Sequence, residues 1–320
     1  MQLVPAVLSA VVLALAQNAV HAQTYPTKPL RLIIPFAPGG ATDLLGRLVA
    51  QRLNERLGQT VIPDNRTGGG GNIGAELVVK SPADGYTILV AGIPHAINMS
   101  LYKKVNYDLA TDLTPITNLA TFPSMIAVHP SMPTRTMKEL VAVARSRPNA
   151  LNYGASPGSP NHLVMELIGV LTGARMVHIG YKGAGPAITD LVGGHLHVSS
   201  LGFPGAMPHV KSGRLRPIAV TSAKRSSLLP ELPTIAESAI PGFDVNSWYG
   251  IFAPPRVPTD IVAKLNTEIR SFMGNDELKA KLSAVGAEVD TNNPPEFAQF
   301  VRSEIDRWAK VVKASGATVN

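Results

Sequence analysis

The chain has 320 residues, of which 45% are hydrophobic and 16% are charged, so a disordered protein is excluded and two domains with a sizeable core are expected. It contains no cysteine, which excludes an anchor through a lipidated cysteine and is compatible with an oxidising compartment. The formal charge is +7, but no basic cluster is interleaved with aromatic residues, so nucleic acid is not an expected partner.

The first 22 residues have the features of a signal peptide. Residues 4–16 form an apolar run of the length of an h-region, too short to span a membrane. Val20-His21-Ala22 places small residues where a signal peptidase reads the chain, which predicts cleavage before Gln23. Residues 1–5 contain no Lys or Arg, which is atypical for an n-region. We expect an exported, soluble protein.

The stretch 30–43 combines a strand, a turn and a helix start. Residues 30–34 form a short apolar run typical of a buried strand, and a loop with two prolines and two glycines follows. A helical pattern then begins near Thr42. The unpaired N–H groups and the helix dipole at such a corner suit an anion, although an ordinary strand-to-helix turn fits the same pattern.

The chain then alternates between strands and helices, which predicts a mostly parallel sheet. The predicted elements are strands at 60–63 and 86–91 and a helix at 72–80. Gly69, Gly71 and Gly74 have the spacing of a dinucleotide-binding loop. The acidic residue of that motif is expected about 20 residues further on, whereas Asp84 follows Gly74 after only ten. A flexible loop that enters a helix is therefore the favoured interpretation.

A second set of α/β elements follows a looser region that starts near residue 109. The predicted strands are 114–120, 124–128, 151–155, 176–179, 197–201, 215–221 and 245–252. The predicted helices are 137–147, 161–171, 185–192 and 205–211. A Pro-rich connector follows at 228–243, and further helices start near 260, 276 and 295. The economical interpretation nests the second α/β unit inside the first, with crossings near 121–126 and 241–249. Residues 125–240 carry eleven Lys and Arg against five Asp and Glu, which favours an anionic ligand or an acidic partner surface.

The sequence around Ser156 resembles the nucleophile motif of a serine hydrolase. Gly154-Ala-Ser-Pro-Gly158 matches the Gly-x-Ser-x-Gly motif of a nucleophile elbow and lies between a predicted strand and a predicted helix. Pro157, however, has no N–H to offer an oxyanion hole, and no spacing identifies the acid and the histidine of a triad. The alternative is a second Gly- and Ser-rich loop at a helix start, where Ser156, Ser159 and backbone N–H groups bind a carboxylate directly or through water.

The histidines do not form a metal-binding pattern. His195 and His197 share one face of a strand, but no Asp, Glu or Cys accompanies them at a defined spacing. Hydrogen-bonded or solvated structural histidines are therefore favoured, and neither a metal nor a cofactor is expected. His162 lies at the mouth of the second loop, one helical turn from Glu166, a spacing that suits capping or an i,i+4 hydrogen bond.

A set of short motifs carries a family resemblance over the chain from about Tyr25 to the C-terminus. The motifs are Ile33-Ile-Pro-Phe-Ala-Pro-Gly-Gly-Ala-Thr-Asp43 with Arg47, Leu57-Gly-Gln, Asn65-Arg-Thr-Gly, Asp84-Gly-Tyr, Gly158-Ser-Pro-Asn-His162, Tyr181-Lys-Gly-Ala-Gly-Pro-Ala187, Asp190-Leu-Val-Gly-Gly194 and Trp248-Tyr-Gly-Ile-Phe-Ala-Pro254. Together and in this order they resemble the Bug family, the periplasmic binding proteins of tripartite tricarboxylate transporters. The chain departs from the usual pattern at Gly180, where the family commonly has proline. Pro157 and Pro160 also remove two donors from the second loop.

The resemblance implies an α/β fold, a two-domain clamshell of the type II periplasmic-binding-protein kind, with discontinuous domains joined by two crossover strands. Domain 1 would comprise residues 23–122 and 246–320, and domain 2 residues 123–245. The two loops would grip a small carboxylate through backbone N–H groups and bridging waters. The implied ligand-binding residues are Phe36, Ala37, Pro38, Gly39, Gly40, Ala41, Thr42, Asp43, Ala155, Ser156, Gly158, Ser159, His162, Tyr181 and Trp248.

The implied function is that of an extracytoplasmic solute-binding protein, not an enzyme. It would deliver a small organic carboxylate to the membrane subunits of a tripartite tricarboxylate-type transporter, and a monomer is expected. The alternatives are a secreted serine hydrolase that uses Ser156 and an orphan receptor that presents its ligand to a sensor protein. The motifs do not name the carboxylate, since di- and tricarboxylates, acidic amino acids and aromatic acids all suit such a site.

Overall fold

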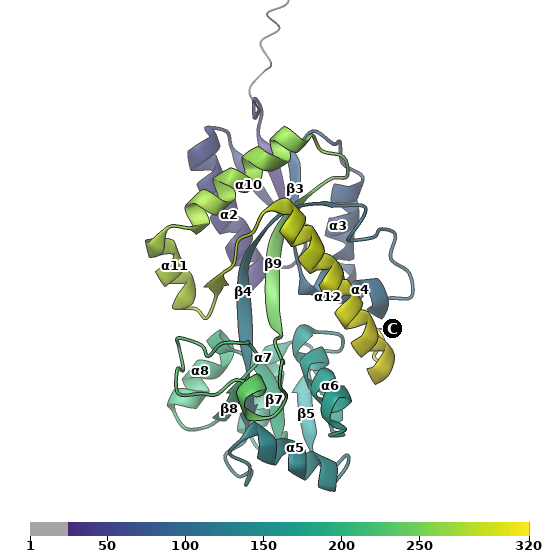
Figure 1. The fold of residues 1–320 in the computed structure, drawn as a ribbon, viewed down its shortest axis with the longest axis vertical. Coiled ribbons are helices and arrows are strands. Elements are labelled where there is room, and N and C mark those ends of the chain that lie inside the picture. Colours follow the sequence, from purple (N-terminus) through teal and green to yellow (C-terminus); the bar gives the residue numbers. More distant parts are fainter. Residues whose placement is uncertain (1–24, 320) are drawn as a thin grey trace, which may run out of the picture.

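The computed structural model describes residues 25–319. The predicted signal peptide and its cleavage before Gln23 lie outside the described residues. Within the described part, no helix has both the length and the apolar character needed to cross a bilayer. Figure 1 shows two domains stacked along the long axis of the molecule, with the strands β4 and β9 running between them.

The sheet of domain 1 has the strand order β2-β1-β3-β9-β4. Its strands are β1 (Leu30–Ile34), β2 (Val61–Asn65), β3 (Thr87–Gly92), β9 (Asn246–Ala253) and the first part of β4 (Thr114–Val128). β1 pairs in parallel with β2 and β3, whereas β9 runs antiparallel to its neighbours β3 and β4. The predicted parallel sheet is therefore confirmed for β1 to β3, and the two crossover strands form its antiparallel part.

Helices cover both faces of this sheet. One face carries α2 (Ala41–Leu57), α10 (Thr259–Met273) and α11 (Asp276–Ser283), and the other carries α3 (Asn72–Val79), α4 (Ile93–Leu101) and α12 (Pro294–Ser315). Successive side chains of a strand point to opposite faces, so β1 contributes Leu32 and Ile34 to the first core and Ile33 to the second. A strand that is buried on both faces reads as the continuous apolar run seen in the sequence.

β4 is a single strand that belongs to both domains. Up to Pro123 it pairs with β9, and from Ser124 onward it pairs with β7 (Val198–Gly202) and β8 (Arg216–Val220). The prediction of two separate strands at 114–120 and 124–128 was wrong. Proline cannot donate a ladder hydrogen bond, but Pro123 is tolerated because the strand changes partners there.

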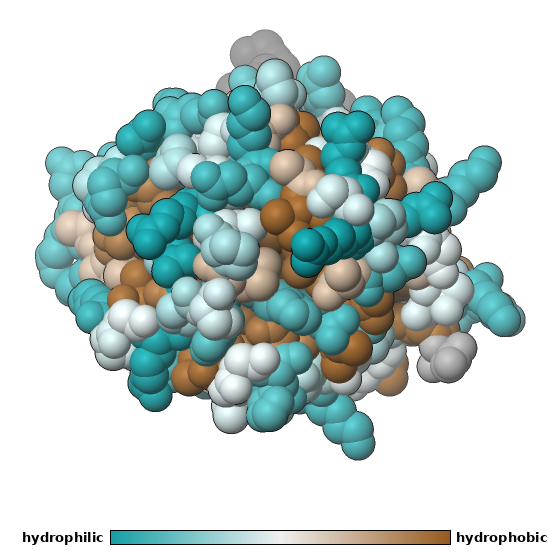
Figure 2. All heavy atoms as spheres, turned by 90° about the horizontal axis from the view of Figure 1, so that it is seen from below, coloured by the Kyte–Doolittle hydropathy of each residue, from teal (hydrophilic) through white to brown (hydrophobic). Residues whose placement is uncertain are grey.

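Domain 2 is built on the second part of β4, in the order β4-β7-β5-β6 with β8 also paired to β4. Its other elements are β5 (Asn152–Ala155), β6 (Val177–Gly180), α5 (Met137–Ser146), α6 (Pro160–Thr172), α7 (Ala184–Val192) and α8 (Phe203–Lys211). The Pro-rich connector contains one short helix, α9 (Ile235–Ser238). Seen from this end in Figure 2, hydrophilic residues cover much of the surface, with hydrophobic residues in separate areas between them.

Two elements of domain 1 were not expected from the sequence. α4 follows β3 without a loop, because Gly92 is both the last residue of the strand and the N-cap of the helix. β10 (Glu288–Val289) adds a two-residue antiparallel pair to β4. α12 packs on α4 and also contacts α6, so this C-terminal helix touches both domains.

Candidate ligand-binding site

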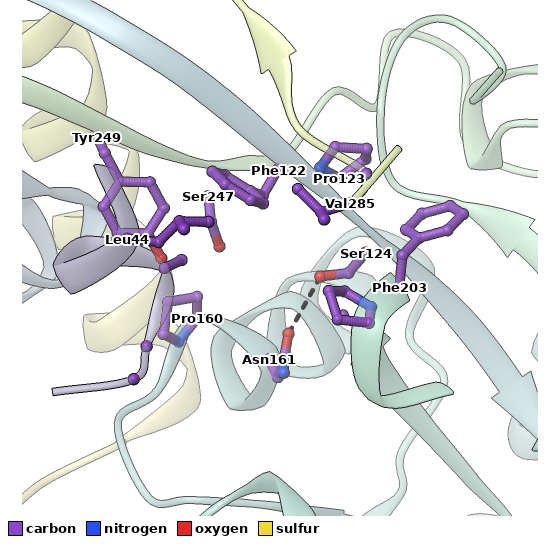
Figure 3. A pocket seen from close by; sticks show the side chains of 16 residues that line it. Leu44, Phe122, Pro123, Ser124, Pro160, Asn161, Phe203, Ser247, Tyr249 and Val285 are labelled. Carbon is purple, nitrogen blue, oxygen red and sulfur yellow. Dashed lines mark hydrogen bonds between the residues drawn. The ribbon is translucent and has the colours of Figure 1, made fainter. Parts of the chain in front are cut away.

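A cavity of about 490 Å³ lies between the two domains at the level of the crossover strands (Figure 3). This volume is within the range of small-molecule sites. Its walls come from the loop before α2, from α6 and α8, from both crossover strands and from the turn between α11 and β10. The lining residues are Gly39, Gly40, Ala41, Leu44, Phe122, Pro123, Ser124, Pro160, Asn161, Gly202, Phe203, Pro204, Ser247, Tyr249, Val285 and Gly286.

Gly39, Gly40 and Ala41 bring the first predicted loop to this cavity. Gly40 is the N-cap residue of α2, and no side chain caps that helix. The first N–H groups of α2 are therefore available to a ligand, and the helix dipole favours an anion there. Ala37 and Pro38 lie on the exposed part of the loop, outside the cavity lining.

Asp43 holds this loop in place from within the protein. Its carboxylate accepts the Gly39 N–H at 3.1 Å and hydrogen bonds from Arg47 Nε and Asn65 Nδ2 at 3.0 Å. The hydrogen bond from Arg47 is the main reason that the pKa of Asp43 lies below its usual value. Asn65 also donates to the Phe36 carbonyl at 2.9 Å. Asp43 is buried and ionised, so it fixes the loop and is not itself a partner for an anion.

The second predicted loop lines a smaller recess of about 120 Å³, and Asn161 lines both the recess and the main cavity. The polar side chains of the recess belong to Ser156, Ser159, Asn161 and Ser200. Ser156 Oγ accepts the Gly183 N–H at 2.8 Å, and Ser159 Oγ accepts the His162 N–H at 3.3 Å. Both hydroxyl groups therefore keep their own hydrogen for donation to a ligand.

Asn161 presents its amide NH₂ group at the boundary between recess and cavity. Its Oδ1 accepts hydrogen bonds from Ser124 Oγ at 3.2 Å, drawn in Figure 3, and from Ser200 Oγ at 3.5 Å. Because the amide oxygen is occupied, Nδ2 is left to donate. The recess offers hydrogen-bond donors and no charged lining residue, an arrangement that suits a carboxylate.

Two stacked histidines support the second loop. The ring centres of His162 and His178 are 3.9 Å apart. His162 Nδ1 accepts the Gly158 N–H at 3.0 Å, and His178 Nε2 donates to the Ala155 carbonyl at 3.0 Å. Burial lowers the pKa of His178, and Glu166 lies 3.7 Å from His162 Nε2. The two rings thus position the loop from behind and do not line either cavity.

Trp248 does not line the cavity, contrary to expectation. Its side chain is 0% exposed, and its Nε1 donates to buried Glu304 at 3.0 Å in the core beneath α12. The neighbouring residues Ser247 and Tyr249 line the cavity instead. Neighbouring side chains of a strand point to opposite faces, which places Trp248 on the side away from the ligand.

Tyr181 and Thr42 lie near the site but outside both linings. The Tyr181 hydroxyl donates to Asp190 Oδ2 at 2.6 Å. Burial, together with this hydrogen bond, raises the pKa of Tyr181 to about 12. Thr42 is buried in the first turn of α2. Both residues support the loops that carry the site.

Sequence reasoning missed eleven side chains that line the main cavity. They are Leu44, Phe122, Pro123, Ser124, Pro160, Asn161, Phe203, Pro204, Ser247, Tyr249 and Val285. A signal existed for five of them, since Phe122, Pro123, Ser124, Ser247 and Tyr249 lie within the predicted crossings. Phe203 begins the helix that follows β7, and the carboxyl end of a strand is a common place for a ligand site.

Ser156 is not paired with a histidine base in residues 25–319. Its Oγ accepts the Gly183 N–H, while the ring of the nearby His162 accepts the Gly158 N–H. A nucleophile needs a hydrogen-bonded base, so the geometry of a serine hydrolase is missing at this motif. The same part of the chain also contains no group of three His, Cys, Asp or Glu residues that could hold a metal ion.

Two of the three glycines of the dinucleotide-like motif are needed for packing. A Cβ atom on Gly71 would lie 2.9 Å from His95 Nε2, and one on Gly74 would lie 2.8 Å from the Pro35 side chain. Gly71 also has a φ of +100°, which favours glycine. The spacing of these residues therefore reflects the close approach of α3 to its neighbours.

The structure has two α/β domains joined by two strands, and helix N-termini of both domains lie at one cavity. This arrangement defines a solute-binding protein of the type II clamshell kind. The chain belongs to the tripartite tricarboxylate transporter family receptors, which it matches over residues 45–317. It is similar to Protein BugT of Bordetella pertussis, with 36% identity over 301 residues, 93% of this chain and 92% of that protein. The expected family is confirmed, and it is a family of receptors rather than enzymes.

Two solved structures extend the comparison. Rpa4515 of R. palustris, solved with adipate, is 41% identical with a TM-score of 0.79, covering 92% of this chain and 99% of that one. MatC of Rhodopseudomonas palustris, solved with bound malate, is 29% identical with a TM-score of 0.75, covering 90% of this chain and 100% of that one. These likenesses confirm the expected two-domain clamshell.

Proposed function

We propose that this protein captures a small organic carboxylate between its two domains and presents it to the membrane subunits of a tripartite tricarboxylate-type transporter. One observation carries the proposal: hydrogen-bond donors of the α2 N-terminus in domain 1 and of Asn161 in domain 2 line the same cavity. An anion held by both would favour a closed arrangement of the domains, which a transporter can distinguish from the empty receptor. The adipate and malate in the two related structures support a carboxylate as the ligand.

The proposed contacts refine the implied set of residues. We assign direct contact to Gly39, Gly40, Ala41, Ser156 and Ser159, and add Asn161. Ala155 lines the recess with its backbone and methyl group, and the other implied residues support the two loops: Phe36, Thr42, Asp43, Gly158, His162 and Tyr181. Waters can bridge the donors to carboxylates of different shape, so no arginine or lysine is required at the site.

The domain division is proposed at the change of partner along β4. Residues 23–122 and 246–320 form domain 1, and residues 123–245 form domain 2. The support is that β4 pairs with β9 up to Pro123 and with strands of domain 2 from Ser124 onward. We further propose a periplasmic monomer released by cleavage before Gln23, in line with the family to which the chain belongs.

Asn161→Asp tests the site most directly. The substitution keeps the side-chain shape but replaces an N–H donor by a carboxylate, which repels an anionic ligand. Truncating one partner of a charged hydrogen bond costs about 1.5–3 kcal/mol, so we expect at least a 10-fold weaker affinity. The measurement is the thermal shift of the purified protein across a panel of carboxylates, followed by calorimetric titration of those that raise the melting temperature.

Asn54→Asp is the matched control, because Asn54 lies on the exposed face of α2 and the substitution adds the same negative charge. It should bind like the wild type. If no carboxylate stabilises the wild-type protein, the proposed function is wrong. If Asn161→Asp binds like Asn54→Asp, the site has been placed wrongly.

A further inference from the structure

The main cavity has a predominantly apolar wall. Figure 3 shows Leu44 and Tyr249 near one end and Phe122, Val285 and Phe203 toward the other, with Asn161 and Ser124 joined by their hydrogen bond below. None of the 16 lining residues carries a charge. The donors of the recess and the N–H groups at the start of α2 thus border a space whose other walls offer mostly carbon atoms, apart from the hydroxyl groups of Ser247 and Tyr249.

Two of these apolar residues are substantially exposed to solvent. Leu44 is 49% exposed and Val285 is 38% exposed, although both are large hydrophobic side chains. They come from opposite ends of domain 1 in the sequence, and both line the same cavity. An apolar ligand body between the domains would remove both from water, which is favourable in proportion to the area covered.

A second, largely apolar hollow adjoins the main cavity. This hollow of about 480 Å³ shares Phe203, Pro204 and Val285 with it. The further lining is Met207, Pro208, Lys211, Leu228 and Ala284, which is apolar except for the lysine. The main cavity, at about 490 Å³, by itself has room for a ligand body longer or wider than that of a four-carbon acid.

We propose that the ligand class is an alkyl or aryl carboxylate, that is, a carboxylate whose body is apolar and free of hydroxyl groups. This inference rests on the proposed function, since it takes the carboxylate to lie at Asn161 and the recess. The body lies along Phe122, Tyr249 and Val285. Hydroxyl groups on the body would lose water and find few hydrogen-bond partners on these walls, so hydroxylated polyacids are discriminated against.

The test is calorimetric titration of the full mature chain with butanoate, hexanoate, octanoate, 6-hydroxyhexanoate and citrate. Burying each methylene group should tighten binding about 4-fold, so octanoate should bind roughly 100-fold or more tightly than butanoate. Hexanoate should bind more tightly than both 6-hydroxyhexanoate and citrate. An affinity that does not change with chain length, or a preference for citrate, overturns the inference while the proposed function stands. If none of these acids binds while another carboxylate of the thermal-shift panel does, the inference is overturned and the proposed function stands. If no carboxylate of that panel binds, the proposed function fails and the inference fails with it.

Val285→Ser locates the apolar body. The side chain is partly exposed, so the fold should tolerate the change, and octanoate should bind about 10-fold more weakly while butanoate changes less than 2-fold. Ile62→Ser is the matched control, because Ile62 is 50% exposed on β2 and lines neither apolar space. It should leave both affinities unchanged. Equal octanoate affinities of the two variants would overturn the placement of the ligand body.

Discussion

Replacing Gly40 by valine tests the first loop with little disturbance of the fold. Gly40 has a φ of −86° and a ψ of 174°, which any residue adopts, and a Cβ atom there meets no protein atom within 4 Å. Gly39 is a poorer choice, because its φ of +95° strains any side chain. Since Gly40 lines the cavity, the valine side chain would occupy the space through which a ligand reaches the N–H groups of α2.

The size of the effect follows from the hydrogen bond that is lost. A hydrogen bond to a charged group contributes about 1.5–3 kcal/mol, so losing one should weaken carboxylate binding about 10- to 100-fold. Replacing glycine at a helix N-cap by valine costs the fold about 1 kcal/mol, and the reduced entropy of the unfolded chain offsets part of this. Calorimetric titration gives the affinity, and urea unfolding gives the stability of the same sample.

Gly185→Val is the matched control for this experiment. Gly185 lies in the first turn of α7, a Cβ atom there also meets nothing within 4 Å, and the residue lines neither the cavity nor the recess. We expect this variant to bind its ligand normally. Equal affinities of the Gly40 and Gly185 variants would show that the first loop is not part of the site, and the reasoning from helix N-termini would be refuted.

Two further predictions concern stability. In Glu304→Ala the buried indole N–H groups of Trp248 and Trp308 lose their acceptor. At about 1–3 kcal/mol for each unsatisfied donor, urea unfolding should show a loss of roughly 2–6 kcal/mol, and a loss below about 1 kcal/mol would contradict this account. Burial lowers the pKa of His95 from 6.5 to about 4. The free energy of unfolding therefore carries no penalty from protonation of His95 above pH 6.5, and it falls as the pH drops from 6.5 toward 4. At about 1.4 kcal/mol per pH unit, the free energy of unfolding should fall by about 3 kcal/mol between pH 6.5 and 4. In His95→Gln the free energy of unfolding should depend less on pH in that range. An unchanged slope of this free energy against pH would rule out His95 as the cause.

Local signals were sufficient for the first loop and for most strands and helices, but not for α4, β10 or the continuity of β4. The apolar run at 30–34 is buried on both sides of one sheet, and the Gly-rich turn after it forms the start of α2. These features depend on neighbours in the sequence, so composition and periodicity reveal them. The pairing of this loop with the recess came from the family resemblance, because contacts between domains leave no periodic signal.

The misplacement of Trp248 has a simple physical cause. In a strand, residues 247, 248 and 249 alternate between two faces, and the sequence alone does not say which face α12 covers. The structure assigns Trp248 to the covered face, where Glu304 accepts its N–H. The role of Asp43 was in principle readable, since Arg47 follows it by four residues, a spacing that brings the two side chains together on a helix.

β4 and β9 cross between the domains as a paired antiparallel ribbon, with Phe122 opposite Ser247 and Pro123 opposite Asn246. Such a ribbon can bend across its face, whereas sliding one strand along the other would break the hydrogen bonds between them. Relative motion of the domains is therefore reduced to nearly one angular coordinate. Bending of the ribbon would therefore change the distance between Gly40 and Asn161 more readily than their lateral alignment.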